Sequence, residues 1–549
     1  MNEERRSFSS SREKRGSGLD LRPFRRPLSV LAVLFFAFLP ADSGAAVVFR
    51  VTIDGGAENH CDGSSWERAL NKEDFCDLME TGGKDDAEYW VASGSYGFGL
   101  EAGAKSSTFL LRRGVSLYGG FKGDEESRDQ RDPSANQTIL DGEGNLYHVV
   151  TISKDADAST VLDGVTVKRG SAAGPYADKK SGGGVYNTGG SPLISNCLFK
   201  DNTASNTGGG MLSKGGSPRL VNCVFEGNRA PSGGGLFVDS GSVELIDCAF
   251  RGNAANKESS GGALFVQNKA EARCEGCEFS DNSSIREGGG AGNSGDCAFV
   301  NCTFSDNRSG KGGAAIFNNG GTVAAVNCTF AGNSPPTGGA VLLNRSGKTV
   351  VVNSVFDDAS NDPPWEAWAE GGSVRIERSA VAGRLGAAFM TEVDVLHGDP
   401  LLGGLRDNGG LTMTRALMEG SPAIGAGYPA GELAAGLDVP IPSVDQRGLR
   451  RPAKGGVSMG AFEYLVESEP TPPKPEPKPG PDPTPDPPTP EPGPAPFPPP
   501  GPTPPTPEPL PGPEPAPEPE PAPEPEPVPA PDPEPEPDPA PHPVHTAGG

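Results

Sequence analysis

The residues most able to do chemistry in this sequence are ten cysteines, and their spacing allows three interpretations. Eight of them lie between Cys197 and Cys328, and six of these eight recur at a nearly constant interval. Such a set could form disulfides, hold a metal ion or fill the interior as free thiols. We favour free interior thiols, because free cysteine is among the most buried residue types and because stacked, parallel side chains would strain a disulfide.

Two smaller cysteine patterns need separate consideration. CEGC, from Cys274 to Cys277, has the ligand spacing of a zinc site, but no second CxxC motif follows and none of the five histidines lies near it in the sequence. Cys61 and Cys76 stand alone near the N-terminus and could pair in an exported protein. We therefore predict no metal site and no cofactor, and we leave the disulfide state of the cysteines open.

A carbohydrate-cleaving site on such a chain would need carboxylates and arginine or lysine on one outer face. Charged residues of this kind gather in the N-terminal region, at Arg112, Arg113, Asp129, Arg131 and Asp132. In the repeats, the residues after each phenylalanine vary in sign and size, as solvated turn residues do. The sequence has no GxSxG, HExxH, P-loop or dinucleotide-binding motif. We therefore predict no catalytic residue.

Six of the cysteines belong to a sequence repeat that occurs seven times between residues 182 and 356. When the copies are aligned on their phenylalanine, successive phenylalanines are 26, 25, 29, 25, 26 and 26 residues apart. A cysteine stands two residues before the phenylalanine in six copies, with Ser354 in the seventh. An asparagine stands three residues before it in five copies, with Asp247 and Gly276 in the other two, and another asparagine stands three residues after it in six copies. The column residues that we predict to be structural are Asn196, Cys197, Phe199, Asn202, Asn222, Cys223, Phe225, Asn228, Cys248, Phe250, Asn253, Cys277, Phe279, Asn282, Asn301, Cys302, Phe304, Asn307, Asn327, Cys328, Phe330 and Asn333.

Self-similarity of this kind indicates a solenoid. Segments such as SVELID and TVAAVN alternate or run apolar with β-branched residues, which predicts strands rather than helices. The predicted fold is all-β: a single-stranded right-handed parallel β-helix with three short strands in each coil. In one copy, we expect Asn327 to bend the chain in left-handed geometry, Cys328 and Phe330 to fill the core, and Asn333 to turn away.

Small residues open each unit, at Gly182, Gly208, Gly233, Gly261, Gly288, Gly312 and Gly338. Glycine suits a place where backbones of neighbouring coils approach too closely for a Cβ atom. We therefore interpret this column as structural.

The two ends of the chain differ in composition from the repeats. Residues 1–46 have a basic start, an apolar stretch too short to cross a bilayer and a small-residue end, which is typical of a signal peptide. Of the 58 prolines, 40 follow Tyr464, so we expect residues 465–549 to form an extended, disordered Pro/Glu-rich tail. Between them we expect an N-terminal cap with the first coils (47–160), the repeats (161–396) and a C-terminal closing module (397–464).

The glycine starts and the FxxN endings together resemble the repeats of polymorphic outer membrane proteins, a family of surface adhesins and autotransporters. The matching segments are GGAAIF, GGALFV, GGAVLL, FKDN, FEGN, FRGN, FSDN and FAGN. The flanks, among them GVSLYGGFKG, RDPSANQTILDG, DQRGLRRP and MGAFEY, resemble choice-of-anchor Q-type right-handed β-helix surface proteins. The usual DAG of their closing module is GAG here, with Gly425 in place of an aspartate. The resemblance implies a cell-surface or secreted β-helix and brings no catalytic residue with it.

These observations favour a non-enzymatic adhesin or display scaffold, exported to the cell surface, the outer membrane or the medium. Its partner would be another cell surface, a matrix protein or a glycan. The net charge of −25 disfavours nucleic acid, and no membrane-spanning segment is expected after signal removal. The alternative is a polysaccharide lyase or glycoside hydrolase of the β-helix type, and a purely structural envelope component is a third possibility.

Overall fold

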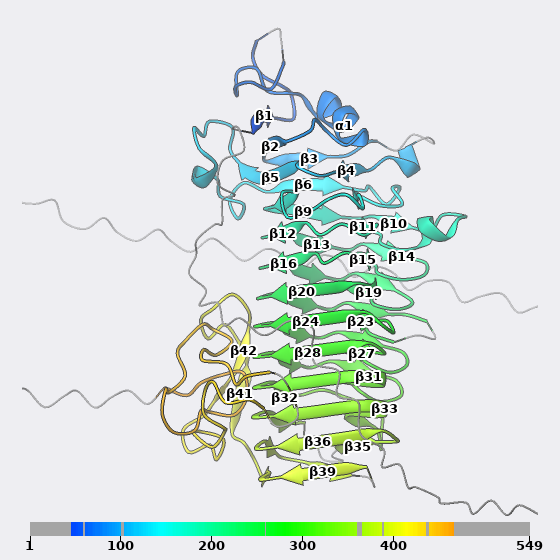
Figure 1. Cartoon of the computed structure of the whole chain (residues 1–549). Helices are drawn as coiled ribbons and strands as arrows, with labels where there is room; N and C mark the ends of the chain where they lie inside the picture. The colour runs from blue at the N-terminus through cyan, green and yellow to red at the C-terminus, as the bar shows by residue number, and fades with distance from the viewer. Residues whose placement is uncertain are drawn as a thin grey trace, which may run out of the picture. The chain divides into compact units, whose positions relative to one another are not determined.

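The computed structural model describes residues 46–58, 61–99, 104–257, 260–358, 365–386, 389–434, 437 and 439–465. Apart from Ala46 and Leu465, the predicted signal peptide and Pro-rich tail lie outside the described residues. The described chain winds into a stack of coils with parallel strands, with an N-terminal cap at one end and a C-terminal module beside the last coils (Figure 1). The predicted all-β, right-handed parallel β-helix is confirmed.

The largest sheet has 22 strands, which form two ladders along the solenoid. The first ladder consists of β4 (Phe109–Leu111), β7 (Val150–Ile152), β11 (Val185–Asn187), β15 (Met211–Lys214), β19 (Leu236–Ser240), β23 (Leu264–Val266), β27 (Ala291–Asn293), β31 (Ile316–Val326), β33 (Ala340–Val352), β35 (Trp365–Ala369) and β38 (Arg384–Gly386). The second consists of β1 (Val47–Val51), β2 (Ala87–Ala92), β5 (Ser116–Phe121), β8 (Val161–Asp163), β12 (Leu193–Ser195), β16 (Arg219–Val221), β20 (Ser242–Ile246), β24 (Glu271–Glu275), β28 (Asp296–Val300), the ends of β31 and β33, β36 (Ser373–Glu377) and β39 (Met390–Val393). The long β31 and β33 take part in both ladders and join them.

A 12-stranded sheet takes one strand from each coil and carries the phenylalanine column. Its strands are β3 (Gly94–Tyr96), β6 (Thr138–Asp141), β9 (Val165–Lys168), β13 (Leu198–Lys200), β17 (Val224–Glu226), β21 (Ala249–Arg251), β25 (Glu278–Ser280), β29 (Thr303–Ser305), β32 (Thr329–Ala331), β34 (Val355–Asp357), β37 (Ala380–Val381) and β40 (Leu396–His397). A six-stranded sheet follows it in the middle coils, with β10 (Ser171–Ala172), β14 (Thr203–Ala204), β18 (Arg229–Ala230), β22 (Ala254–Ala255), β26 (Ser283–Ser284) and β30 (Arg308–Ser309). The middle coils thus contain four strands, and the prediction of three was wrong because it missed these two-residue strands.

The columns of the repeat become ladders because each strand pairs with its copy one coil away. Phe199 pairs with Phe225, Phe225 with Phe250, and the pairing continues to Phe356. The phenylalanine rings of successive coils stack with centroids 4.5 to 5.2 Å apart, close to the spacing of neighbouring strands. The side chains from Phe199 to Phe330 are fully buried in the main core, which confirms the predicted filling role of this column.

The asparagine before the cysteine makes the predicted left-handed bend. Its φ is +53° at Asn196 and +51° at Asn222, Asn301, Asn327 and Asn353. In this region of φ a residue with a Cβ atom is strained. Glycine adopts it most readily, and asparagine is among the most tolerant of the other residues.

The second asparagine column does not turn away from the core, so the expectation for Asn333 was wrong. Asn333 is 3% exposed, and the left-handed residue of this bend is Gly332, with φ of +71°. Asn202, Asn228, Asn253, Asn282 and Asn307 are likewise buried at 0% exposure. The physical reason is that the bend leaves backbone groups without strand partners, and a buried amide can satisfy them.

The opening glycines bring backbones of neighbouring coils together, as predicted. Gly208 has φ of +63°, and a Cβ atom on Gly209 would lie 2.6 Å from the carbonyl oxygens of Arg229 and Gly234. Strand register places Gly313 and Gly339 in this column, so the alignment at Gly312 and Gly338 was one residue early.

The N-terminal cap is built around α1 (Lys72–Glu80), which begins at Asn71, whose side chain accepts a hydrogen bond from the Asp74 amide at 2.8 Å. Phe75 and Met79 of α1 are fully buried against the first coils. Short 3₁₀ turns lie at η1 (Ala104–Ser106), η2 (Arg128–Gln130) and η3 (Ala177–Lys180). No helix of the described residues is long and apolar enough to cross a membrane.

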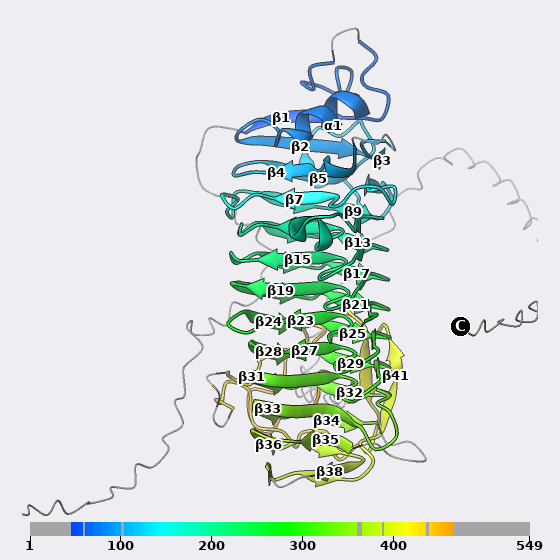
Figure 2. The same cartoon turned by 90° about the vertical axis from the view of Figure 1, so that its right-hand side faces the viewer.

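The C-terminal module starts after His397, where β40 ends the solenoid, and contains the antiparallel pair β41 (Leu402–Arg406) and β42 (Thr414–Leu417). The module turns back and lies along the side of the lower coils, as Figures 1 and 2 both show. It therefore covers an outer face of the solenoid.

Candidate binding surfaces

The cysteine column lies inside the solenoid. All ten cysteines, each within the described residues, are free thiols. The six column thiols are 0 to 2% exposed, and each Sγ lies 3.1 to 3.6 Å from two backbone carbonyl oxygens. Burial raises the pKa of the Cys197, Cys248 and Cys302 thiols, which disfavours the reactive thiolate. The predicted core position of this column is confirmed.

The other cysteine patterns are also part of the packing. Cys274 lies at a core position of β24, and Cys277 lies in the thiol column. Among the described residues, no group of three or more His, Cys, Asp or Glu is arranged to hold a metal ion. Cys76 donates to the Gly97 carbonyl at 3.5 Å, and burial raises its pKa to about 12, whereas Cys61 lies beside other carbonyls. The two N-terminal thiols thus have separate partners in the structure.

The charged N-terminal residues are also engaged in local contacts. Arg131 forms a salt bridge of 2.5 Å with Asp163 and donates to the Gly119 carbonyl. Asp132 accepts hydrogen bonds from Ser134 and thereby orders its own turn.

The two neighbouring arginines are held elsewhere in the cap. Arg112 donates to the carbonyls of Gly82 and Gly83, and Arg113 pairs with Asp157. Arg112, Arg113, Arg131 and Asp132 thus each have a local structural partner, and Asp129 lies in the 3₁₀ turn η2.

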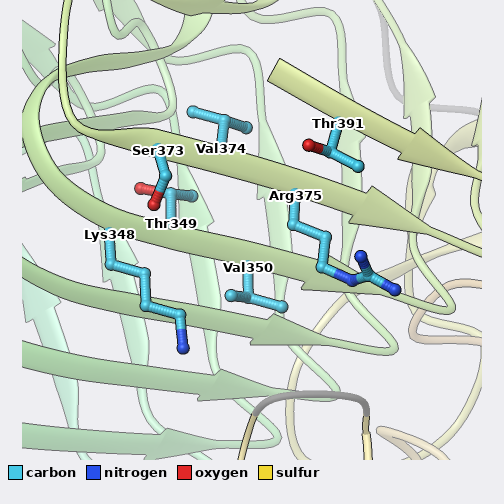
Figure 3. Close-up of a pocket in the computed structure, with 7 residues that line it drawn as sticks. All are labelled: Lys348, Thr349, Val350, Ser373, Val374, Arg375 and Thr391. Carbon is cyan, nitrogen blue, oxygen red and sulfur yellow. The ribbon is translucent and has the colours of Figure 1, made fainter. Parts of the chain in front are cut away.

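A hollow of about 370 Å³ lies on the outer face of β33, β36 and β39. Lys348 and Arg375 extend along it in Figure 3, beside the hydroxyls of Ser373 and Thr391. Arg375 also pairs with Glu377 at 2.8 Å. Two basic side chains and two hydroxyls thus lie together at this hollow.

A second hollow, of about 170 Å³, lies beside β11 and β15. Tyr186 and Leu212 form its apolar floor, and Asp178, Lys214 and Asp239 are among its walls. Its floor is well packed, since Tyr186 is only 9% exposed and its ring stacks on His148 at 4.7 Å.

An extensive set of hydrogen bonds and apolar contacts joins the outer face of the lower coils to the C-terminal module. Asn301 donates through Nδ2 to the Val444 carbonyl at 2.9 Å and accepts through Oδ1 from Arg451 Nη2 at 2.8 Å. One coil further, Asn327 Nδ2 donates to the Ser458 carbonyl at 3.1 Å. The bend asparagines thus point outward and bond to the module.

The next bend repeats this contact. Asn353 donates through Nδ2 to the Tyr428 carbonyl at 3.2 Å and accepts from the Tyr428 amide at 2.8 Å. Beside the asparagines, outward residues of the coils pack with buried residues of the module in one apolar cluster. Its members are Ala298, Val300, Ala324, Val326, Val350, Val352, Ala434, Leu437, Val439, Ile441 and Val457.

One ion pair lies inside the module beside the interface, and a second crosses it. Arg451 is fully buried and lies 2.9 Å from Glu463, and Glu463 also accepts from the Ser458 amide and hydroxyl. Nearer to β42, Arg415 pairs with Asp306 at 2.9 Å. A buried pair of this kind requires good hydrogen bonding to offset desolvation, which the surrounding groups provide.

Sequence reasoning assigned the bend asparagines to backbone geometry and missed this second role. The signal available was the position of the asparagine between two inward residues, such as Ile194 and Cys197, which leaves Asn196 outside the core. What covers it was not visible in the sequence, because the contacts join residues more than 70 positions apart.

Comparisons with known proteins agree with this architecture. A family profile described as "Right handed beta helix region" matches residues 152–292 and 184–356. The chain therefore contains a right-handed β-helix region. No curated protein sequence matches it.

Two solved structures of pectin-active enzymes are distantly similar to the chain. The pectate lyase Pel9A aligns with 12% identity over 76% of this chain and 96% of its own, with a TM-score of 0.44. A deglycosylated pectin methylesterase from Aspergillus niger aligns with 14% identity over 65% of this chain and 87% of its own, with a TM-score of 0.23. With TM-scores below 0.5, neither likeness bears on the activity of this chain.

Proposed function

We propose that this protein is an exported surface or secreted scaffold that acts by binding, as an adhesin or display protein, and not by catalysis. The observation that supports this best is the binding of the C-terminal module to the outer face of the coils. Asparagine side chains, an apolar cluster and the Arg415–Asp306 ion pair keep that polypeptide on the outer face of the lower coils. An outer face with this chemistry is suited to binding other polypeptides.

We further infer that the coils are of the polymorphic outer membrane protein type, displayed at the cell surface or outer membrane. The seven glycine starts and the FxxN endings support this assignment. The partner would be another cell surface, a matrix protein or a glycan. The net charge of −25 disfavours nucleic acid.

The test is adhesion of beads that carry the full-length chain. They are applied to cultured cells, to immobilised matrix proteins and to a glycan array, with beads that carry the heat-denatured chain as the matched control. Saturable adhesion that requires the folded chain is the expected result. Equal adhesion of folded and denatured chain on every surface would contradict the proposal.

A second candidate is a polysaccharide lyase or glycoside hydrolase, for which the hollow with Lys348 and Arg375 is the supporting observation. The test incubates the full chain with a panel of acidic polysaccharides and measures new unsaturated and reducing ends. Steady product release that is lost in Lys348→Ala and Arg375→Ala would favour the enzyme over the scaffold. No release above that of the denatured chain would favour the scaffold.

A further inference from the structure

The surface that holds the C-terminal module continues into coils that the module does not cover. In the described residues, hydrogen bonds between the module and the coils run from the Gly276 carbonyl to Glu377. Above Gly276, the same bend column continues with Asp247, Asn222 and Asn196, all left-handed, with φ of +51° to +53°. The coils of β12, β16 and β20 therefore present the same backbone geometry above the module (Figure 1).

The apolar part of the surface continues in the same register. Strand pairing aligns Val221 with Ile246, then with Glu275 of β24, and then with Val300, Val326 and Val352. Glu275 pairs with Arg273 and separates the uncovered apolar residues from the covered valines. Val300, Val326 and Val352 are 0 to 3% exposed because the module packs on them. Val221 and Ile246 occupy equivalent outward positions and are partly exposed. On the other side of the bend, Leu198 and Val224 are also outward and partly exposed.

We propose that this strip, formed by Asn196, Leu198, Val221, Asn222, Val224 and Ile246, binds an extended polypeptide segment of a partner protein. The inference rests on the proposed scaffold function and names its partner class. In each of three covered coils, the outward asparagine bonds to a backbone carbonyl of the module while a neighbouring valine packs on its apolar residues. In the uncovered strip, Asn196 Nδ2 donates to the Asp163 carboxylate, and Asn222 Nδ2 donates to Asn196 Oδ1 at 2.8 Å. An amide nitrogen has two donors, and Asn353 Nδ2 likewise bonds both to Asn327 Oδ1 and to the Tyr428 carbonyl, so Asn222 can serve a partner in the same way.

The charges around the strip also favour a polypeptide over an acidic glycan. Arg219 pairs with Glu244 at 2.9 Å, and Lys200 pairs with Glu226 at 2.5 Å. These flanking cations are matched by anions on the next coil, so the strip attracts no strongly charged ligand. Apolar contact and hydrogen bonding to the peptide backbone are what remain, as in other modes of extended-peptide recognition.

The experiment selects a phage-displayed library of random linear peptides on the full-length chain. Enriched peptides are then measured against the variant Val221→Glu/Ile246→Glu, which places two charges on adjacent coils of the strip. The matched control is Thr203→Glu/Arg229→Glu, an exposed pair that is also adjacent, on the six-stranded sheet. We expect affinity to fall at least about tenfold in the strip variant and to remain unchanged in the control.

A milder variant tests the amide contribution. Asn222→Gly keeps the left-handed backbone but removes the side-chain donor, and we expect it to weaken peptide binding about three- to tenfold. Circular dichroism and thermal unfolding of each variant show whether the coils stay folded. Failure to enrich any peptide, or peptides that bind the strip variant as tightly as the wild type, would overturn the inference.

The adhesion assay separates this inference from the scaffold function itself. Beads with the strip variant that adhere as well as the wild type would overturn the strip and leave the scaffold function standing. Wild-type beads that fail to adhere would overturn the scaffold function. Glycan-array binding that is lost specifically in the strip variant would replace the polypeptide partner with a glycan.

Discussion

Two asparagine columns run along this solenoid, one in each direction from the phenylalanine, and they serve different purposes. The bend column, which includes Asn222, has left-handed backbone geometry and sends its side chains outward. The buried column, which includes Asn253, has ordinary backbone geometry and keeps its amides inside. The same residue type is thus selected once for its backbone and once for its side chain.

In the buried column each amide bridges three coils. Asn253 Nδ2 donates to the Phe225 carbonyl at 2.8 Å and to Asn282 Oδ1 at 3.0 Å. Its Oδ1 accepts from both the backbone and side-chain nitrogens of Asn228, at 3.1 and 3.0 Å. The bend column has fewer internal bonds, which leaves its amides able to bond to the module.

The largest loss of stability is expected when an asparagine of the buried column is replaced. Asn253→Ala leaves two donors of Asn228 without partners inside the core, so the free energy of unfolding should fall by about 4 kcal/mol. Urea unfolding followed by circular dichroism measures this change. The matched control is Asn222→Ala in the bend column, and equal losses in both variants would contradict the distinction between the columns.

The next largest loss of stability is expected when the contact between the module and the bend column is weakened. Arg451→Met leaves Glu463 buried without its cation inside the module and removes the donor to Asn301 across the interface, which should cost about 3 kcal/mol and loosen the module on the coils. Limited proteolysis should then cut residues 398–464 sooner while the upper coils persist.

The double variant Arg451→Met/Glu463→Gln should recover part of the loss, because it removes the uncompensated charge. If the single variant is digested at the wild-type rate, Arg451 does not hold the module on the coils.

The end of the buried column should make stability depend on pH. Asp358 continues the column after Asn333, and burial together with the nearby Glu366 carboxyl raises its pKa. Burial raises the pKa of Glu366 from 4.5 to about 7. Both folded pKa values lie above the unfolded ones, so the folded state holds a proton that the unfolded state releases. This contribution is present below about pH 4.5 and is lost as the pH rises through about 7.

The size of this contribution is on the order of 2 kcal/mol. Thermal unfolding across that pH range should show the loss, and Asp358→Asn/Glu366→Gln should flatten it. Burial also raises the pKa of Asp247 to about 7, so both proteins should carry Asp247→Asn as a common background. A pH profile unchanged by the double substitution would exclude the acid pair as its source.

The smallest effect is expected in the uncovered bend column. Asn222→Ala places an alanine in left-handed geometry and should cost about 1 kcal/mol, whereas Asn222→Gly should cost less because glycine adopts this geometry without strain. The midpoint of urea unfolding measures both. A glycine variant less stable than the alanine variant would show that the side-chain bond from Asn222 to Asn196 outweighs the backbone strain.

The coil itself was accessible from the sequence because the contacts that define it repeat. Phe199, Phe225 and Phe250 recur at the length of one coil, and stacking like residues is the simplest way to bury all of them. The bend at Asn196 followed from the tolerance of asparagine for left-handed geometry, and the core position of Cys197 followed from its regular place in the repeat. The fourth, two-residue strand had no periodicity of its own to reveal it.

The candidate binding surface was much less predictable. Its residues appear in the repeat as Asn301 and Asn327, but their partners in the module follow no repeat and lie more than 130 residues away. The Lys348 and Arg375 hollow likewise forms only when β33 and β36 are side by side. The sequence position of an outward residue gives no information about which segment packs on it.

By itself, the sequence determined the coil length, the inward columns and the position of each bend, because these depend on local geometry and on contacts between identical residues. Only the tertiary structure decided that Asn333 points inward, that the module turns back along the lower coils, and that the same surface stays uncovered above Gly276. Those outcomes depend on hydrogen bonds and packing between segments without common periodicity. Such contacts are set by the competition for burial in the folded chain and have no local signature.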